Sequence, residues 1–293
     1  MQRSVNQLFS ASKLANGGHP PRRPLSDFAR GLKLGGGGGG VVYRATDRVT
    51  GGTVALKLLQ PRRDLPPDAI QLFLREIAVH ASLSHPHIVP VVTFGEDGGK
   101  PWLVLAYVDG PDLERHVEDA GPLAVDVARR VGVQLCGALA HAHGRGVVHR
   151  DVKPSNVLLA GPPPWTAHLA DFGVAKALEG VGAASWTQTH VLRGTPAYAA
   201  PEQLEDAKRA GPAADQYGLA ATLYFALTRT SHLVGPLEGY PGVGSVLRAE
   251  RVPLRTRRAD VPEALAAAVD RALSRAPADR FPSVQAFGDA LRG

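Results

Sequence analysis

The stretch that most constrains this chain is a polar octet at residues 149–156, which is set between two apolar runs. It reads His-Arg-Asp-Val-Lys-Pro-Ser-Asn, with Gly-Val-Val before it and Val-Leu-Leu after it. Short runs rich in β-branched residues favour buried strands. The octet is therefore predicted to be a tight loop between two strands.

The octet carries three side chains of complementary chemistry. Asp151 is a proton acceptor, Lys153 is a point positive charge, and Asn156 offers an amide oxygen. Phosphoryl transfer depends mostly on positioning and on electrostatic stabilisation, and it needs groups of these kinds close together. This loop is accordingly the candidate catalytic centre.

A second carboxylate follows one hairpin later. A turn at Pro162-Pro163-Pro164-Trp165 leads into a predicted strand at residues 167–170. Asp171 follows directly after this strand. Strands of one hairpin lie side by side, so Asp171 and Asn156 are expected to meet. Carboxylate and amide oxygens are the ligands that Mg²⁺ prefers. The pair predicts a Mg²⁺ site.

A run of six glycines at residues 35–40 lies between strand-like sequences. Gly35, Gly37 and Gly40 fit the spacing GxGxxG, and Val42 follows two residues later. Glycine lets backbone N–H groups approach phosphates without a Cβ in the way. The segment is predicted to be a hairpin with a phosphate-covering tip.

Lys57 ends the next apolar run, where an unpaired ammonium group would be costly. Apolar residues at helical spacing then begin at Ile70 and continue to Ala81, after a capping-box pattern at residues 68–71. Glu76 lies at the edge of this apolar stripe. We expect Glu76 to pair with Lys57.

These motifs occur in the same chain order as in protein kinases. His-Pro-His-Ile-Val at 85–89, Asp-Phe-Gly at 171–173, Ala-Pro-Glu at 200–202, Asp-Gln-Tyr-Gly at 215–218 and Pro-Ala-Asp-Arg-Phe at 277–281 complete the set. The chain thus resembles the bacterial (Hanks-type) serine/threonine protein kinase family, from about residue 27 to residue 291.

The resemblance implies an α+β, protein-kinase-like two-lobe fold. A small lobe, rich in antiparallel strands and with one key helix, would span about residues 27–106. A larger, mainly helical lobe would span about residues 109–293. Residues 1–26 are polar, basic and proline-rich, so they are predicted to be a disordered arm.

The resemblance also implies roles for individual residues. Asp151 would orient the substrate hydroxyl and accept its proton, Lys153 would neutralise the transferred phosphoryl group, and Asn156 and Asp171 would hold Mg²⁺. ATP would be bound by a set drawn from both lobes: Gly35, Gly37, Gly40, Val42, Ala55, Lys57, Glu76, Ala106, Val108 and Leu158. Asp112 is a weaker candidate for a contact to the ribose.

Further roles follow from the same resemblance. Arg150 would meet a phosphate on Thr187 or Thr189 of the activation segment, and Thr195 would help to select Ser/Thr substrates. Asp215 would brace the backbone of the catalytic loop, and Arg280 would pair with Glu202. Autophosphorylation in trans would need a dimer.

Composition and charge limit the kinds of partner and location that we expect for this chain. The formal net charge is +6, but no nucleic-acid-binding motif accompanies it, so no nucleic-acid partner is expected. The longest apolar stretch of helical pattern is too short for a bilayer, which needs about 20 residues. The single cysteine, Cys136, lies in an apolar helical pattern and is predicted to be a buried thiol. A cytoplasmic protein is expected.

Two alternatives stay open at this stage. The all-glycine loop, and a histidine at position 80 where kinases usually place an apolar residue, would suit a nucleotide-binding module without turnover. A small-molecule phosphotransferase of related fold fits less well, because the Ala-Pro-Glu segment serves a protein acceptor.

Overall fold

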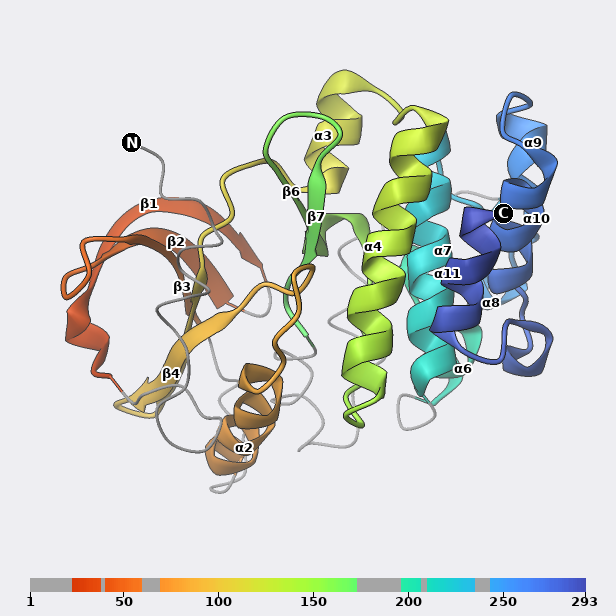
Figure 1. Ribbon diagram of the computed structural model, residues 1–293. Helices are drawn as coiled ribbons and strands as arrows, with labels where there is room; N and C mark the ends of the chain where they lie inside the picture. Colours follow the sequence, from red (N-terminus) through yellow and green to blue (C-terminus); the bar gives the residue numbers. More distant parts are fainter. Residues whose placement is uncertain (1–22, 38–39, 60–68, 173–195, 207–209, 235–242) are drawn as a thin grey trace. The chain divides into compact units, whose positions relative to one another are not determined.

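The computed structural model describes residues 23–37, 40–59, 69–172, 196–206, 210–234 and 243–293, and it divides them into two compact units (Figure 1). The described part of unit 1 lies between residues 23 and 108, with residues 85–87 left out. Unit 2 contains residues 85–87 and the described residues from 109 onward. The change of unit between Val108 and Asp109 lies close to the expected one.

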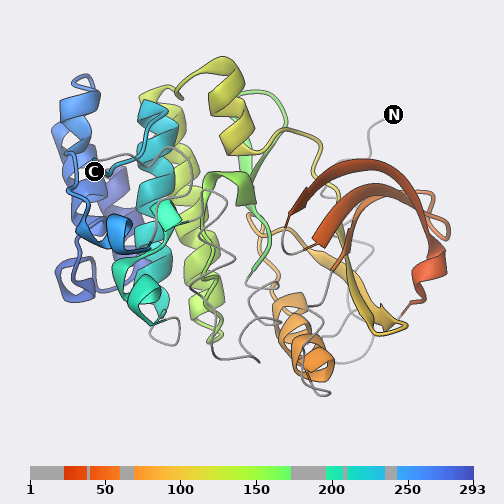
Figure 2. The same cartoon turned by 180° about the vertical axis from the view of Figure 1, so that it is seen from behind.

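Unit 1 is built on an antiparallel five-stranded sheet, drawn in red to yellow in Figure 1 and from behind in Figure 2. Its strand order is β1-β2-β3-β5-β4. The strands are β1 (Phe28–Gly37), β2 (Gly40–Asp47), β3 (Thr53–Leu58), β4 (Val91–Asp97) and β5 (Lys100–Ala106). Alternating residues bury one face, on which Phe28, Val54 and Trp102 pack together. Burial of this face positions the strands that carry Val42 and Lys57.

Among the described residues of unit 1, one α-helix, α2 (Ala69–Ala81), accompanies the sheet and lies beside β4 (Figure 1). Its bounds confirm the helix expected from the apolar spacing after residue 68. Ile77 faces inward and is fully buried.

The last four residues of the predicted arm, 23–26, are among the described residues. A short 3-10 turn, η1 (Leu25–Asp27), precedes β1. Before it, the guanidinium of Arg23 donates to both carboxylate oxygens of Asp47 at 2.8 and 2.6 Å, and to Asp27 at 3.0 Å. Composition marked this stretch as an arm, whereas an ion pair with a distant strand end holds it in place.

Unit 2 is mainly helical and includes one short hairpin, formed by β6 (Val157–Ala160) and β7 (Thr166–Leu169). Its α-helices in the described residues are α3 (Leu113–Ala120), α4 (Val125–His143), α6 (Pro201–Glu205), α7 (Pro212–Thr228), α8 (Val243–Arg248), α9 (Leu254–Arg257), α10 (Glu263–Ala272) and α11 (Val284–Arg292). An α+β, protein-kinase-like architecture is thereby confirmed.

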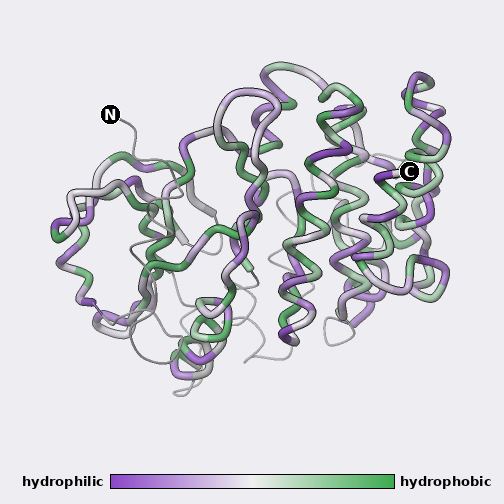
Figure 3. The backbone as a smooth tube through the Cα atoms, in the orientation of Figure 1, coloured by the Kyte–Doolittle hydropathy of each residue, from purple (hydrophilic) through white to green (hydrophobic). Residues whose placement is uncertain are grey.

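Helix α7 is the centre of unit 2 and packs against α4, α10 and α11 (Figure 1). Nearly every residue from Ala214 to Leu227 is buried, which is typical of a helix that is apolar all round. The outer helix α11 instead buries Val284, Phe287 and Leu291 and leaves hydrophilic residues between them (Figure 3). Helix α4 ends at Gly144, as expected.

Candidate active site

The octet lies between the end of α4 and the β6–β7 hairpin. Strand β6 begins directly after Asn156, as predicted. The apolar run at residues 146–148 is not a strand, and here the prediction was wrong. Val147 donates its N–H to the carbonyl of Ala142, so the run completes the C-terminus of α4 and pairs with no strand of the described residues.

One buried carboxylate holds the backbone at the start of the octet. Asp215, near the N-terminus of α7, accepts from the N–H of His149 at 2.8 Å and from the N–H of Arg150 at 2.7 Å. Arg150 has φ 65°, a left-handed conformation that is unfavourable for a residue with a Cβ. The two hydrogen bonds stabilise that conformation and confirm the bracing role expected of Asp215.

His149 is fully buried, and its neighbours fix where its proton resides. Its Nε2 lies 2.9 Å from the carbonyl oxygen of Ala170, which can only accept. Its Nδ1 lies 3.2 Å from the N–H of Asp151, which can only donate. Burial lowers the pKa of His149. A neutral ring with hydrogen on Nε2 therefore ties the octet to the end of β7.

Asp151, Lys153 and Asn156 come together as predicted. The Lys153 Nζ lies 2.9 Å from an Asp151 carboxylate oxygen. Asn156 donates from Nδ2 to the same carboxylate at 3.1 Å and to the Asp151 carbonyl at 2.8 Å. Because Nδ2 faces two acceptors, the amide orientation is set and the Asn156 Oδ1 remains available as an acceptor.

Asp171 follows β7 and has φ 59°, a second left-handed backbone at this site. The register of the hairpin pairs Val157 with Leu169, and Ala170 donates its N–H to the carbonyl of Asn156 at 2.9 Å. The backbones that carry Asn156 and Asp171 are therefore joined. An amide oxygen and a carboxylate on adjacent strand ends fit Mg²⁺ by donor type. In the described residues, no group of three or more His, Cys, Asp or Glu side chains is arranged around a metal position.

In unit 1, the predicted phosphate-covering hairpin is paired with the strand that carries Lys57. Val42 on β2 is paired with Gly35 on one side and with Lys57 on the other. Gly40 has φ 131°, and a Cβ there would lie 2.3 Å from the carbonyl of Leu58. At Gly35, by contrast, a Cβ would meet nothing within 4 Å. The sheet requires glycine at position 40 and would admit a side chain at position 35.

The remaining ATP candidates lie in or next to strands β3, β5 and β6. Ala55 is paired with Leu105, and the N–H of Ala106 donates to the carbonyl of Pro90 at 3.0 Å. Val108 is buried. In unit 2, Leu158 forms an isolated bridge with Asp112, whose Oδ1 caps α3 by accepting from the N–H of Arg115.

Several predictions fall outside the described residues. Gly37 ends β1, but the tip at residues 38–39 is not described. The backbone of Glu76 is within α2 and its side chain is outside the described set, so the Lys57–Glu76 pair stays a prediction. Thr187, Thr189 and Thr195 also lie outside it.

Comparison with known proteins decides the family. The family described as "Protein kinase domain" matches residues 28–285. The chain belongs to the protein kinase family.

Two curated relatives of this kinase domain are bacterial serine/threonine-protein kinases. PknK of Mycobacterium tuberculosis is 40% identical over 265 residues, covering 89% of this chain and 23% of that protein. PkaA of Streptomyces coelicolor is 37% identical over 276 residues, covering 88% of this chain and 48% of that protein. The chain thus spans a quarter to a half of the length of these relatives.

Solved kinase structures share its fold. The kinase domain of Mycobacterium tuberculosis PknI has a TM-score of 0.69 at 31% identity, covering 95% of this chain and 99% of that one. Rad53 1–466 in complex with AMP-PNP has a TM-score of 0.72 at 27% identity, covering 90% of this chain and 64% of that one.

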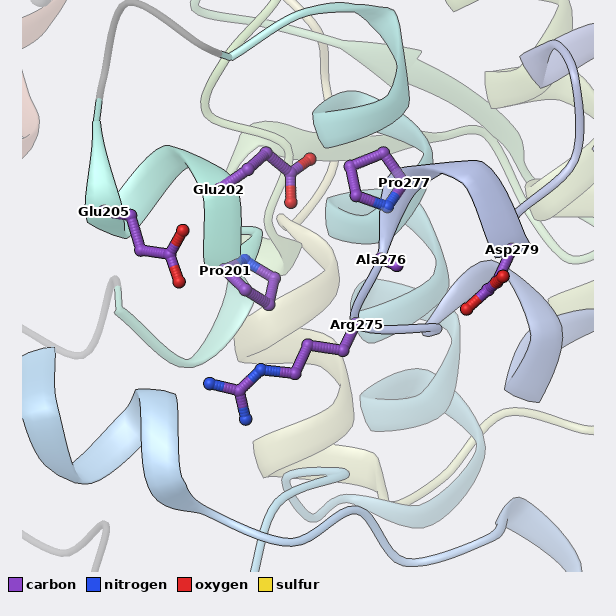
Figure 4. Close-up of a pocket in the computed structure, with 7 residues that line it drawn as sticks. All are labelled: Pro201, Glu202, Glu205, Arg275, Ala276, Pro277 and Asp279. Atoms are coloured by element: carbon purple, nitrogen blue, oxygen red, sulfur yellow. The ribbon is translucent and has the colours of Figure 1, made fainter.

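The predicted ion pair between Arg280 and Glu202 is confirmed. The side chain of Arg280 is completely buried and makes a two-pronged contact with the Glu202 carboxylate at 2.7 and 2.8 Å. A pocket beside this pair is lined by Pro201, Glu202, Glu205, Arg275, Ala276, Pro277 and Asp279 (Figure 4). It contains none of the predicted catalytic residues.

Sequence reasoning missed three residues that support the kinase loop. His143 places its Nε2 2.8 Å from Asp215, and Gln203 donates to the carbonyl of Arg150 at 2.7 Å. Gly218 on α7 faces Val152, whose carbonyl would lie 2.8 Å from an added Cβ. An isolated glycine in an apolar helix was a signal for close packing, whereas no sequence signal marks Gln203.

No helix in the described part of the chain is long and apolar enough to cross a membrane.

Proposed function

We propose that this chain is a serine/threonine protein kinase that transfers the γ-phosphoryl group of ATP to Ser or Thr hydroxyls of proteins. The observation that carries the proposal is the placement of Asp151, which has Lys153 at 2.9 Å and Asn156 at 3.1 Å. Asp215 holds the preceding backbone in its left-handed turn. Such a preorganised charged loop suits phosphoryl transfer.

In this proposal each charged side chain has one task. Asp151 orients the acceptor hydroxyl and takes its proton, and Lys153 offsets negative charge on the transferred phosphoryl group. Lys57, held by Glu76, positions the α- and β-phosphates beneath Gly35, Gly37 and Gly40. Mg²⁺ held by Asn156 and Asp171 would neutralise phosphate charge. Ala55, Ala106, Val108 and Leu158 would enclose the adenine.

The test is phosphoryl transfer to a generic protein substrate with ATP and Mg²⁺, read by intact mass. Asp151→Asn should lower the rate about 10²- to 10⁴-fold, the usual contribution of a positioned base. The control is Asp126→Asn, whose side chain is 83% exposed on α4, and it should keep the wild-type rate. ATP binding without transfer by the wild type would show a nucleotide-binding module, and transfer only to small molecules would show a different phosphotransferase.

We also propose regulation by phosphorylation of Thr187, Thr189 or both, in a cytoplasmic protein that phosphorylates itself in trans through a transient dimer. Arg150, which follows His149 in the braced loop, would contact the phosphate, since phosphothreonine accepts bidentate arginine hydrogen bonds. Thr195 would contact the substrate segment.

Replacing Thr187 and Thr189 together with alanine should lower activity well below that of the phosphorylated wild type. Arg150→Ala added to that variant should cause little further loss. A double alanine variant as active as the phosphorylated wild type would disprove the regulatory role and leave the catalytic assignment intact.

A further inference from the structure

Four histidine side chains lie in a row in unit 2, and none has a task in the proposed reaction. The ring centroids of His141 and His85 are 5.2 Å apart, those of His85 and His87 are 5.6 Å apart, and those of His87 and His168 are 6.3 Å apart. His141 belongs to α4 and His168 to β7. We name these four side chains the imidazole row.

Residues 85–87 join the two elements. The His87 carbonyl accepts from the N–H of Leu169 at 2.9 Å, and the His87 ring lies 2.9 Å from the carbonyl oxygen of Ala167. On the other side, the His85 ring faces Gly137 of α4. These few contacts place a three-residue stretch on both β7 and α4, which lie side by side in Figures 1 and 2.

Two hydrogen bonds of the row, at His85 and His141, require neutral rings. Nδ1 of His85 accepts from the N–H of His87 at 3.2 Å, and Nδ1 of His141 accepts from the guanidinium of Arg145 at 3.2 Å. A protonated imidazole carries hydrogen on both nitrogens and accepts nothing. Protonation of His85 or His141 would therefore place an Nδ1–H group against the N–H group that it now accepts from, and that hydrogen bond would break.

Apart from the Ala167 carbonyl beside His87, the described surroundings of the row do not stabilise added charge. Nε2 of His141 and Nδ1 of His168 are buried without a hydrogen-bond partner in the described residues. The charged neighbour that acts on the row is Arg145, and its charge also opposes protonation. No carboxylate among the described residues contributes to the pKa of any of these four rings.

We propose that the imidazole row is an acid-sensitive latch. Neutral rings pack together and hold residues 85–87 on β7 and α4, and protonated rings repel one another and release that stretch into water. Strand β7 ends at Leu169 and the chain runs on through Ala170 to Asp171, so release loosens the support of the strand that precedes the candidate metal ligand.

The direction of the pH effect follows from the burial of the rings. Burial and the neighbouring imidazoles lower the pKa of His85 and of His168 from 6.5 to about 4. A histidine whose folded pKa is lowered stabilises the closed state above its free pKa, and that stabilisation is lost as the pH falls below about 6.5. At pH 5, each of these two rings should favour release about 10- to 30-fold relative to pH 7.5.

Amide hydrogen exchange on the whole chain tests the latch directly. The probe is the amide of Leu169, which donates to His87, and the internal reference is the amide of Leu159, which donates to Pro111 outside the row. After correction for intrinsic exchange rates, the protection of Leu169 relative to Leu159 should fall at least tenfold between pH 7.5 and pH 5.0. It should recover when the pH is raised again.

The matched variant combines His85→Asn with His168→Gln. Neither new side chain titrates, and the asparagine oxygen can still accept the N–H of residue 87 in an Asx turn. This variant should keep the protection of Leu169 at pH 5.0. The control His116→Asn, at a partly buried histidine of α3 that packs against Trp165, should lose protection as the wild type does.

Equal protection of Leu169 at both pH values in the wild type would overturn the latch. So would an equal loss of protection in the double variant. If the double variant does not fold, NMR titration of the wild-type histidine rings decides: His85 and His168 must titrate together with the loss of Leu169 protection, and ordinary titration near pH 6.5 without that loss refutes the proposal.

Discussion

Replacing Arg280 with methionine should destabilise unit 2 by about 3–5 kcal/mol, the usual cost of removing one partner of a buried ion pair. All five N–H groups of this side chain are used. Besides its two bonds to Glu202, it donates to the carbonyls of Ala213, Ser274 and Arg275 at 2.8, 2.8 and 3.1 Å. The variant leaves a nearly buried carboxylate and three carbonyls without their donor.

Scanning calorimetry of the whole chain gives the measurement. For a unit of 150–250 residues, 1 kcal/mol shifts the midpoint by about 2–4 °C, so the transition of unit 2 should fall by about 6–20 °C. Glu202→Gln should cost less, because the amide oxygen still accepts one of the two bonds. The control is Arg275→Met, since Arg275 is an exposed neighbour of the pair, and its midpoint should move by about 2 °C or less.

A double-mutant cycle separates the pair from the packing of each side chain. Glu202→Leu combined with Arg280→Met should destabilise unit 2 by clearly less than the sum of the two single changes, because neither charge is left unpaired. A midpoint for Arg280→Met within the range of Arg275→Met would refute the reasoning that this guanidinium stabilises unit 2.

Asp215→Asn should lower turnover at least tenfold with a smaller effect on the ATP KM, since the new amide cannot accept from both braced N–H groups; steady-state kinetics with a protein substrate measures this. Gly218→Ala should lower turnover and the melting midpoint together, because its Cβ would lie 2.8 Å from the Val152 carbonyl; an unchanged rate would show that the loop tolerates the shift. The Arg23 guanidinium lowers the pKa of Asp47, so their pair stabilises unit 1 above about pH 4 and loses this effect as the pH falls further. Arg23→Ala should therefore flatten the acid dependence of the unit 1 midpoint below pH 4, and an unaltered acid profile would contradict this.

The sequence by itself determined the elements whose causes are local. Apolar residues at helical spacing predicted the helix at 69–81, and a short β-branched run predicted the strand after Asn156. Chain order alone predicted the meeting of Asp151, Lys153 and Asn156, because residues of one tight loop are bound to be neighbours. Such features need only local hydrogen bonding and a consistent apolar pattern.

The same local reasoning failed at residues 146–148, where an apolar run looked like a strand. A strand exists only if a second chain segment pairs with it. Here the N–H of Val147 is taken by the end of α4, which no pattern within the run could reveal. The ion pair of Arg23 was missed for a similar reason, since its partner Asp47 lies 24 residues away.

The tertiary structure alone decided which distant side chains support the loop. Asp215, His143 and Gln203 are separated from their partners by 53 to 72 residues, so their contacts depend on how α4, α6 and α7 pack. The imidazole row is likewise assembled from three separate segments. The sequence gives the number of histidines. Only the packing of the folded chain decides whether four of their rings lie together without a carboxylate to balance their charge.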